Sequence, residues 1–588
     1  MRVVIDFETK DPFISRKMGS GWVYGRDTDF RVLGCGVKCG DDPSIWIDML
    51  QNLDEGYAQL EGILSVATHV ICHNAEYDVG CLKYLGLYDK IYRIRDTMIG
   101  AKLVHNALPS YSLDALSERY LGKHKTSSTL GDLARSLGLV KNCRQDAEGI
   151  AKKNMDLLYE ADPKVVAKYC LQDVELTHEL DKYIEKEVGY KLYEKYSSIV
   201  HPLLAMRDRG VAIDVTAAQS LSDKYKGLIE ALECEIKALL RDAGLSEDVN
   251  IDSSQQLAVA FGEMGVKTSL TAAGNPSVTA AWMKTTEHPL AKKLLEINKY
   301  TKAKNDFVDY MLEIQRDGLI HPQMNPISAR TGRFSCSSPN IQQIPGKGEI
   351  GEEIRSLFVA NKDEMWYSLD YSQQEPRLQV HFAAVLAESG IIENSEALQL
   401  AVKAFADNPN TNMHQQATDL INMQTGANYT AKQMKAVNLG ITYGMGLAKL
   451  AASLNVDEKK AKELRDTYNE HFPFVKQLAK ACKDTLENRG WLKSLSGRKL
   501  RLEEGSDQHY KAINLLIQGS AADQTIEALL QLWSLGIVPS SCIHDEINLS
   551  TSNERAAEKT KEIMEKCVDL KVPVVAQLGK GKNWSEAK

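Results

Sequence analysis

Several features that mark secreted and membrane proteins are missing from this chain of 588 residues. None of its apolar runs is long enough to cross a bilayer, which excludes a spanning helix. The first residues, MRVVIDFETK, lack the basic start, apolar run and small-residue cleavage site of a signal peptide. We therefore expect a protein that acts in the cytoplasm and has no membrane partner.

Metal-binding and disulfide cysteine patterns are missing too. The 11 cysteines include no CxxC pair, and no histidine-rich stretch follows Cys35 and Cys39, whose spacing comes nearest to one. Reduced, buried thiols are the better interpretation. There is also no low-complexity tract, clear repeat or long linker. The length alone predicts several structural units, about four.

An overall excess of positive charge, which is typical of proteins that bind nucleic acids, is also absent, because the net charge is −8. Basic residues nevertheless gather locally. Residues 476–501 contain eight basic and two acidic residues, and no acidic residue lies between Asp317 and Glu349. Either run by itself is equally typical of a solvated surface, so both count only in combination with the motifs below.

Four carboxylates in the first third of the chain have a spacing that allows them to converge. VVIDFETK is typical of a strand with Asp6 and Glu8 on one face, and Asp78 follows a second apolar strand in HVICHNAEYDVGCL. In VVAKYCLQDVELTHEL, helical spacing puts Tyr169 and Asp173 on one face. Carboxylate oxygens suit Mg²⁺ or Mn²⁺. Two such ions about 4 Å apart can activate water against a phosphodiester. Simple exposure explains any one of these acids, but not all of them in this order.

A second group of acids occurs in the C-terminal half. EMWYSLDYSQQEPRLQVHFA begins as an apolar strand and has Asp370 near its end, where helix capping is the alternative role. SSCIHDEINLS predicts one strand, with Asp545 on the opposite face from His544 and Glu546. If Asp370 and Asp545 face each other about 4 Å apart, they repel by ~4 kcal/mol at an effective dielectric constant of ~20. A divalent cation would remove this conflict.

Between these acids, TAKQMKAVNLGITYGMG predicts a helix with an unusual polar stripe. The residues that share this face are Lys432, Lys435, Leu439 and Tyr443. Such a stripe suits a helix that presents cations to phosphates and a ring to a base. Two other segments, ECEIKALLRDAG and HPLAKKLLEINKYTKAKNDFVDYMLEI, predict long helices within about 215–320.

These motifs resemble those of known enzyme families. DYSQQEPR, KAVNLGITYG and IHDEI resemble motifs A, B and C of the family A DNA polymerases, the DNA polymerase I type. ARTGRFSCSSPNIQQIP, GWLKSLSGRKLRL and AINLLIQGSAAD are similar to further segments of that family. The three acidic motifs of residues 1–190 resemble those of the DnaQ-like 3′–5′ proofreading exonucleases. The resemblance covers nearly the whole chain, and we expect a phage-like version without the separate 5′-nuclease domain.

The resemblance implies an α/β multidomain fold, a ribonuclease H-like exonuclease followed by a right-hand polymerase. The expected domains are the exonuclease (1–190), the palm entry and helical thumb (191–324), the first part of the palm (325–425), the fingers (426–504) and the second part of the palm with motif C (505–588). It also implies a replicative, proofreading enzyme that adds dNTPs to primer–template DNA as a monomer, in the cytoplasm of a bacterial or phage-infected cell. Dependence on accessory proteins stays open.

The resemblance further implies two Mg²⁺ ions at each active site, with Mn²⁺ as an alternative. The exonuclease ligands would be Asp6, Glu8, Asp78 and Asp173, and Tyr169 would orient the attacking water. The polymerase ligands would be Asp370 and Asp545, with Glu546 a weaker candidate.

Other motif residues would bind substrates. The nucleotide-binding residues would be Glu375, Lys432, Lys435, Leu439 and Tyr443, and those in contact with DNA would be Arg333, Asn514, Gln518 and His544. Lys435 would also assist catalysis, and Glu375 would exclude a 2′-hydroxyl. Arg377 would support either Glu375 or the palm.

Two positions depart from the family pattern. Motif B usually opens with a basic residue where this chain has Ala431, and Lys432 lies about 100° further around a helix. Whether Lys432 takes over the γ-phosphate contact stays open. Leu439 stands where the family usually has Phe or Tyr, which leaves the response to the sugar 3′ position open.

Three alternatives remain at this point. A stand-alone exonuclease or RNase D-like enzyme explains only the first third of the chain. A single-subunit RNA polymerase shares the Asp, Lys, Tyr and Asp pattern, but Glu375 and the exonuclease motifs argue against it. A non-catalytic DNA-binding scaffold would tolerate loss of the carboxylates. Primer extension with Mg²⁺, with dNTPs or NTPs offered separately, distinguishes them.

Overall fold

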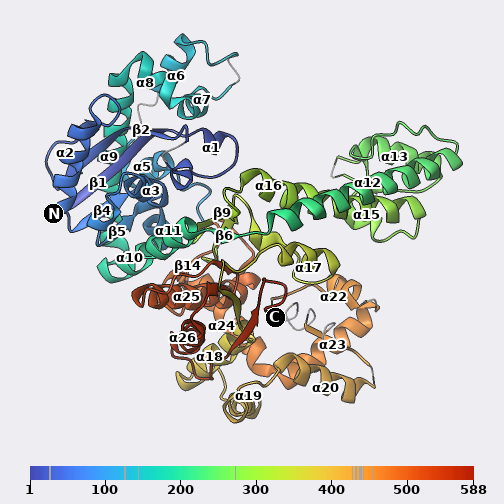
Figure 1. Cartoon of the computed structure of the whole chain (residues 1–588). Coiled ribbons are helices and arrows are strands. Elements are labelled where there is room, and N and C mark those ends of the chain that lie inside the picture. The colour runs from blue at the N-terminus through green and yellow to red at the C-terminus, as the bar shows by residue number, and fades with distance from the viewer. Residues whose placement is uncertain are drawn as a thin grey trace. The chain divides into compact units, whose positions relative to one another are not determined.

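The computed structural model describes residues 1–588 except 26–27, 125–127, 143–144, 272, 427, 431–433, 436–439, 441–442 and 455. The chain divides into two compact units (Figure 1). The first consists of Met1–Gly210, His321–Gln342 and Tyr367–Lys580, and the second of Val211–Ile320, Gln343–Trp366 and Gly581–Lys588. Within the described ranges, no helix combines the length and apolar character needed to cross a membrane.

The N-terminal part of the first unit is built on a five-stranded sheet in the order β3-β2-β1-β4-β5. Its strands are β1 (Arg2–Lys10), β2 (Arg31–Cys39), β3 (Ile45–Asp48), β4 (His69–Cys72) and β5 (Ile94–Asp96). β1 pairs antiparallel with β2 and parallel with β4, and β4 pairs parallel with β5. The parallel β4–β5 pair requires a crossover, in which α3 (Glu76–Tyr84) lies.

Helices surround this sheet (Figure 1). They are α1 (Pro12–Ser15), α2 (Leu53–Ser65), α4 (Thr97–Val104), α5 (Leu113–Leu121), α6 (Ser128–Ser136), α7 (Ala147–Lys153), α8 (Met155–Ala161), α9 (Pro163–Val188), α10 (Tyr190–Ser197) and α11 (Val200–Arg209). α9 begins where Asp162 caps its first turn and Pro163 fills its first position. A Cβ on Gly36 of β2 would lie 2.8 Å from the Cys170 Sγ, so this glycine allows α9 to approach the sheet closely.

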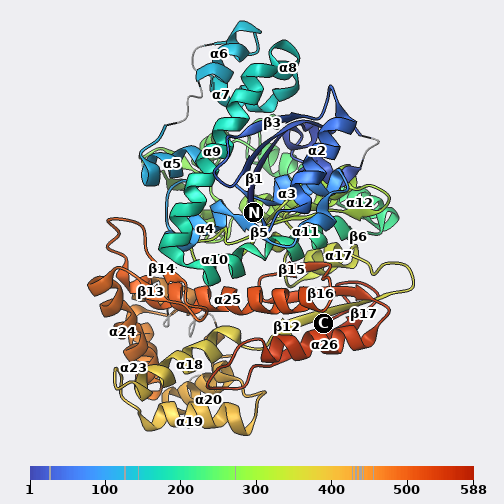
Figure 2. The same ribbon diagram turned by 90° about the vertical axis from the view of Figure 1, so that its left-hand side faces the viewer.

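The C-terminal part of the first unit contains a four-stranded sheet in the order β15-β16-β12-β17. Its strands are β12 (Met365–Tyr371), β15 (Ser541–Ile543), β16 (Glu546–Thr551) and β17 (Ala576–Gly581). Nearby are α18 (Gln374–Glu388), α25 (Ala512–Ser534) and α26 (Glu554–Lys566) (Figure 2). The hairpin of β10 (Gln323–Asn325) and β11 (Ser335–Ser337) belongs to the same unit.

The first unit also contains a mainly helical region with its own apolar core. Its elements are α19 (Glu396–Asp407), α20 (Met413–Thr425), α22 (Leu447–Leu454), α23 (Glu458–His471), α24 (Pro473–Arg489), β13 (Leu492–Lys493) and β14 (Lys499–Leu500). Phe405, Leu450 and Phe474 lie in one buried cluster there, so these helices pack around a common core.

The second unit is mostly helical. Its helices are α12 (Val215–Asp242), α13 (Ser254–Glu263), α14 (Ala280–Met283), α15 (Pro289–Lys302), α16 (Tyr310–Ile314) and α17 (Glu349–Ser356). Short strands are β6 (Val211–Ala212), β7 (Ser269–Leu270), β8 (Pro276–Ser277) and β9 (Leu319–Ile320). Both long helices that the sequence predicts are confirmed: the first as α12, and the second as α15 and α16 joined by a π-helical segment, Ala303–Asp309.

The single strand predicted for SSCIHDEINLS is wrong. β15 ends at Ile543 and β16 begins at Glu546, and these two residues pair across an antiparallel hairpin. His544 and Asp545 form the turn, with His544 at φ +60°, a left-handed conformation common in tight turns. Asp545 is therefore at the tip of a hairpin rather than on one face of a strand.

Two candidate active sites

The first site lies where β1 meets α3 and α9. The register of β1 pairs Asp6 with Gly36 and Glu8 with Gly34, so both acids share one face. One ligand atom each from Asp6, Glu8 and Cys170 lie within 4.8 Å of one another, a spacing that could hold a metal ion. The Cys170 thiol donates to the Asp6 backbone oxygen at 3.2 Å and to its carboxylate at 3.3 Å.

Asp78 reaches the same place from α3. It is buried, and its Oδ1 accepts a hydrogen bond from the Phe7 backbone N–H at 2.9 Å. Burial, followed by the charge of Asp6, raises the pKa of Asp78 well above its ordinary value. Carboxylates that are crowded together and shielded from water favour a bound proton or a cation.

α9 contributes Tyr169 and Asp173, both buried and four residues apart on one face. Burial, then Asp173 and Glu8, raise the pKa of Tyr169, so the phenol keeps its proton at neutral pH. The structure therefore brings Asp6, Glu8, Asp78, Tyr169 and Asp173 together, as the sequence motifs predict.

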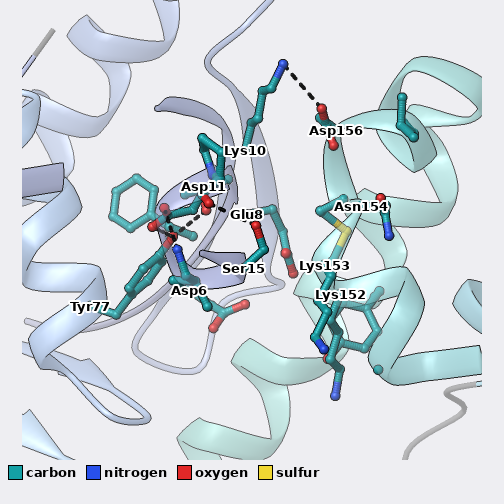
Figure 3. A pocket seen from close by; sticks show the side chains of 18 of the residues that line it. Asp6, Glu8, Lys10, Asp11, Ser15, Tyr77, Lys152, Lys153, Asn154 and Asp156 are labelled. Carbon is teal, nitrogen blue, oxygen red and sulfur yellow. Dashed lines mark hydrogen bonds and ion pairs between the residues drawn. The ribbon is translucent and has the colours of Figure 1, made fainter. Parts of the chain in front are cut away.

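A pocket of about 650 Å³ opens onto this group. Figure 3 shows Asp6 and Glu8 on β1 across from Lys152 and Lys153, which belong to α7. Lys152 forms an ion pair with Glu148 at 2.7 Å, and its ammonium lies 5.8 Å from the centre of the Tyr169 ring. The pocket thus combines the carboxylates of β1 with two lysines of α7, and an ion pair between Lys10 and Asp156 joins its two sides.

The second site lies at the end of β12 beside the β15–β16 turn. The Tyr371 N–H donates to the Asp545 backbone oxygen at 3.4 Å, which holds the segments of Asp370 and Asp545 side by side. The Asp370 side chain reaches solvent, yet surrounding protein atoms and the charges of Asp545 and Glu546 raise its pKa to about 7, with Lys435 opposing. Asp370 does not cap α18, because the cap position belongs to Gln373.

Asp545 experiences a similar environment. Burial raises its pKa, while Arg333 and His544 act in the opposite direction. Arg333, His544 and Asp545 line one small hollow together with Gln342 and Gln374. The second site thus places two carboxylates and cationic groups within electrostatic range of one another.

Glu375 connects two other motif residues, Arg333 and Tyr443. Its Oε1 accepts a hydrogen bond from Arg333 at 2.5 Å, and its Oε2 accepts one from the Tyr443 hydroxyl. Burial and the Glu375 charge raise the pKa of Tyr443, which therefore stays protonated. Arg377 does not contact Glu375. Its guanidinium donates to the backbone oxygens of Ser372, Pro573 and Pro409 and so joins three separate segments of the chain.

The remaining sequence candidates differ in placement. Lys435 is helical and exposed, whereas Lys432 and Leu439, like Ala431, lie outside the described residues. Asn514 and Gln518 are half-buried one turn apart on α25, and neither lines the hollow that contains Arg333 and His544. Glu546 is the first residue of β16.

Besides the pocket lysines, sequence reasoning missed Cys170, Gln373 and His414 at these sites. Cys170 adjoins the motif residue Tyr169, but thiols are not expected in a Mg²⁺ site, so no signal favoured it. Gln373 donates to the Thr411 oxygen at 2.5 Å and accepts from the Met413 N–H at 2.8 Å, which ties the start of α18 to α20. Burial and Lys435 lower the pKa of His414 to about 4, with Glu375 opposing, so this histidine adjoins the second site as a neutral group.

Comparisons with known proteins agree with this geometry. The family model described as DNA polymerase family A matches residues 215–586, and the one described as 3'-5' exonuclease matches residues 24–189. The exonuclease match begins after Asp6 and Glu8, so these two acids rest on the motif and the geometry.

Relatives and one solved structure are similar along most of the chain. A DNA-directed DNA polymerase of Pseudomonas phage M6 is 27% identical over 100% of this chain and 94% of its own. The DNA polymerase DpoZ of Vibrio phage phiVC8 is 27% identical over 95% of this chain and 93% of its own. The POL domain of Pol1 from M. smegmatis, in complex with DNA primer-template and dNTP, has a TM-score of 0.78 at 22% identity. The two structures align over 100% of this chain and 96% of the M. smegmatis chain, so the two chains share the same fold. The chain belongs to DNA polymerase family A and is a phage-like DNA-directed DNA polymerase that carries an N-terminal 3′–5′ exonuclease domain.

Proposed function

We propose that Asp370 and Asp545 form the polymerase centre and that Asp6, Glu8, Asp78 and Asp173 form the proofreading centre, each with two Mg²⁺ ions. The observation that carries the proposal is that each group of carboxylates is crowded enough to raise a pKa within it. Domains of both families generally use divalent ions, and carboxylate oxygens are the donors that such ions prefer. Bound there, the ions would supply Lewis-acid activation and charge neutralisation for phosphoryl transfer.

At the polymerase centre, the other residues position the incoming dNTP. Lys435 binds the phosphates and assists protonation of the leaving pyrophosphate. Glu375 lies beneath the deoxyribose and excludes a 2′-hydroxyl, and Tyr443, which is bonded to Glu375, packs near the nascent base pair. Glu546 is a weaker ligand candidate than Asp545. Phosphoryl transfer leaves mainly positioning and electrostatic work for these groups.

Primer–template DNA is contacted by a separate set of residues. These are Arg333, Asn514, Gln518 and His544, which come from the β10–β11 loop, α25 and the β15–β16 turn. Lys432 and Leu439 belong to the proposed nucleotide-binding set, on the strength of motif B alone. Positive charge at Arg333 suits a backbone phosphate, and the amides suit base edges in the minor groove.

At the proofreading centre, Tyr169 orients the water that attacks the terminal phosphodiester. Its raised pKa keeps the hydroxyl as a donor or acceptor rather than a phenolate. Lys152 and Lys153 lie across the pocket, where they suit the phosphates of a single strand. This arrangement hydrolyses a mispaired 3′ end, while Asp370 and Asp545 extend a paired one.

We also assign domains on the family pattern. The exonuclease extends to about residue 190, the palm entry and thumb occupy 191–324, the palm 325–425 and 505–588, and the fingers 426–504. Separate apolar cores around Ile236 and Leu294 in the thumb, and around Phe405 and Leu464 in and beside the fingers, support independent packing. We further propose that the enzyme replicates DNA as a monomer in the cytoplasm of a bacterial or phage-infected cell, as the phage relatives suggest.

Two assays on the full-length enzyme test the proposal. Primer extension with Mg²⁺, with dNTPs and NTPs offered separately, should proceed with dNTPs alone. Degradation of a 3′-labelled single strand without dNTPs should proceed from the 3′ end and stop when EDTA is added. Extension with NTPs at a similar rate, or persistence of either activity in EDTA, contradicts the proposal.

A further inference from the structure

A second pocket, of about 470 Å³, adjoins the first at Asp6. It shares Asp6, Phe7, Ile14 and Tyr77 with the first pocket and is also lined by Asp78. Two of its lining residues, Gln323 and Ser338, come from the polymerase part of the chain. Both belong to the same compact unit as the exonuclease residues. Asp6 therefore lines both pockets, and the second pocket is built from the exonuclease and polymerase parts of the chain.

The β10–β11 hairpin is fastened to the wall of this pocket. Gln323 pairs with Ser337 in the hairpin register, so Gln323 and Ser338 lie at the same end. The Gln323 Nε2 donates to Glu76 at 3.1 Å, and Glu76 is itself buried in an ion pair with Arg207. The Ser338 hydroxyl donates to the Lys17 backbone oxygen at 3.2 Å. These contacts hold both side chains at a fixed distance from the carboxylates.

The backbone around this pocket is unusual. Lys17, Asn74 and Ser338 line it and have φ values of +62°, +66° and +53°. They are three of the eight non-glycine residues with positive φ in the part of the chain that the structure describes. Such conformations persist where surrounding contacts enforce them, often at ligand sites. Their concentration here indicates a surface shaped for binding.

We propose that this pocket binds one nucleotide unit of the single strand that the exonuclease degrades, and that Gln323 and Ser338 contact it. The inference rests on the proposed proofreading function. The volume is within the range of about 300–1,000 Å³ that small-ligand sites occupy. Asn74 and Gln323 each carry an amide donor and acceptor, which match base edges, and Lys17 suits a phosphate.

The β10–β11 hairpin would then contribute to both centres. Its loop, between β10 and β11, carries Arg333, which binds Glu375 at the polymerase centre. Its open end, at Gln323 and Ser338, forms part of the exonuclease pocket. One short element of the palm thus contributes to substrate binding at both centres.

Steady-state degradation of a 3′-labelled single strand tests the contact. Gln323→Leu keeps the volume but removes the amide, so KM should rise about 5-fold while kcat changes less than about 2-fold. Asn325→Leu is the matched control, because Asn325 lies two residues along the same strand and does not line the pocket. Its KM should stay unchanged. Equal effects in both variants, or no rise in Gln323→Leu, would overturn the proposal.

A crosslinking experiment tests the same contact without turnover. Full-length Asp6→Ala enzyme is irradiated with single strands that carry 4-thiothymidine at the last or the penultimate position. Crosslinked peptides should include Gln323 or Ser338 for one of the two positions, and Gln323→Leu should weaken that signal. Crosslinks confined to residues 1–210 would overturn the proposal. A wild-type enzyme that does not degrade single strands would instead overturn the proposed proofreading function, and this inference with it.

Discussion

Tyr443 and Glu375 are joined by a hydrogen bond from the phenol to the carboxylate, although 68 positions separate them. The second oxygen of Glu375 is held by Arg333 at 2.5 Å. Both carboxylate oxygens are thus engaged, and Glu375 fixes the Tyr443 ring as well as the loop that carries Arg333. If these residues select deoxyribose over ribose, the selection depends on the Glu375 carboxylate and on the Tyr443 ring that it holds in place.

Replacing Glu375 should relax sugar selection. Glu375→Ala should raise ribonucleotide incorporation relative to deoxyribonucleotide by roughly 10-fold or more, with some loss of rate, because the group that excludes the 2′-hydroxyl is gone. Single-nucleotide kinetics with one base in both sugar forms measure this. Tyr443→Phe keeps Glu375 but removes the hydrogen bond between the two side chains. This variant therefore separates the effect of that hydrogen bond from the effect of the carboxylate itself. Unchanged discrimination in Glu375→Ala would show that selection resides elsewhere.

The two centres should be separable. Asp6→Ala combined with Glu8→Ala should lower degradation of single-stranded DNA by ~10³-fold or more and leave extension largely intact, because its ligands come from β1, α3 and α9 only. Asp545→Ala should have the reverse effect. Both activities are measured on the same preparations, with circular dichroism as the check on folding. Loss of extension in a folded Asp6/Glu8 variant would contradict two independent sites.

Asp370 should destabilise the metal-free enzyme above neutral pH. Its folded pKa of about 7 lies above the ordinary 3.8, so the native state holds this proton more tightly than the unfolded chain. Stability is therefore lost as pH rises from about 4 to about 7, and the loss persists above that. In EDTA at pH 8, Asp370→Asn should raise the free energy of unfolding by about 1 kcal/mol, after allowance for solvent screening.

Thermal melts in EDTA at several pH values, and again with Mg²⁺, measure this effect. The gain in Asp370→Asn should shrink toward pH 4, and Mg²⁺ should raise Tm more in the wild type than in the variant. Extension should be lost in the variant. If Asp370→Asn raised the free energy of unfolding equally at pH 5 and pH 8, the charge on Asp370 would not be what destabilises the wild type.

His201 should make the protein sensitive to mild acid. Burial lowers its pKa to about 4, and its ring lies 9° from parallel with Trp533 and within 2.7 Å of the Tyr88 hydroxyl. The unfolded histidine takes up a proton near pH 6.5 and the native one does not, so stability falls as pH drops from about 6.5 to 4. His201→Phe keeps a ring but cannot take up a proton. In this variant the acid-induced loss of unfolding free energy should be smaller by about 2–3 kcal/mol.

Urea denaturation at pH 7.5 and pH 5 measures the slope for both proteins. Some slope should remain in His201→Phe, because burial also lowers the pKa of His381 to about 4. Identical slopes in the variant and the wild type would show that His201 is protonated in the native state at pH 5.

The buried pair of Arg498 and Asp523 should be costly to break. Arg498 donates to Asp523 at 2.6 Å and also to the oxygens of Thr331 and Gly519, and the Tyr196 hydroxyl donates to Asp523 at 2.6 Å. Asp523→Ala leaves the guanidinium buried without its counter-charge, which should cost about 3–5 kcal/mol. Tyr196→Phe removes one hydrogen bond and should cost about 1 kcal/mol. Chemical denaturation that ranks Tyr196→Phe as the more damaging change would contradict this account.

The sequence by itself determined which acids of the first site share a face of one element, because local patterns carry that information. Period-two alternation put Asp6 and Glu8 on one face of β1, and a four-residue spacing put Tyr169 and Asp173 on one face of α9. Such features depend on residues that are neighbours in the chain, so they can be recognised without the fold.

Tertiary structure decided whatever depends on residues far apart in sequence. It turned the predicted strand at His544 into a hairpin, brought Cys170 against Asp6, and joined Glu375 to Arg333 and Tyr443. It also placed Gln323 in the pocket that Asp6 and Asp78 line, which no local pattern predicts. The physical reason is that packing and long-range hydrogen bonds select one partner among many chemically similar side chains. That selection depends on the whole core and not on local spacing.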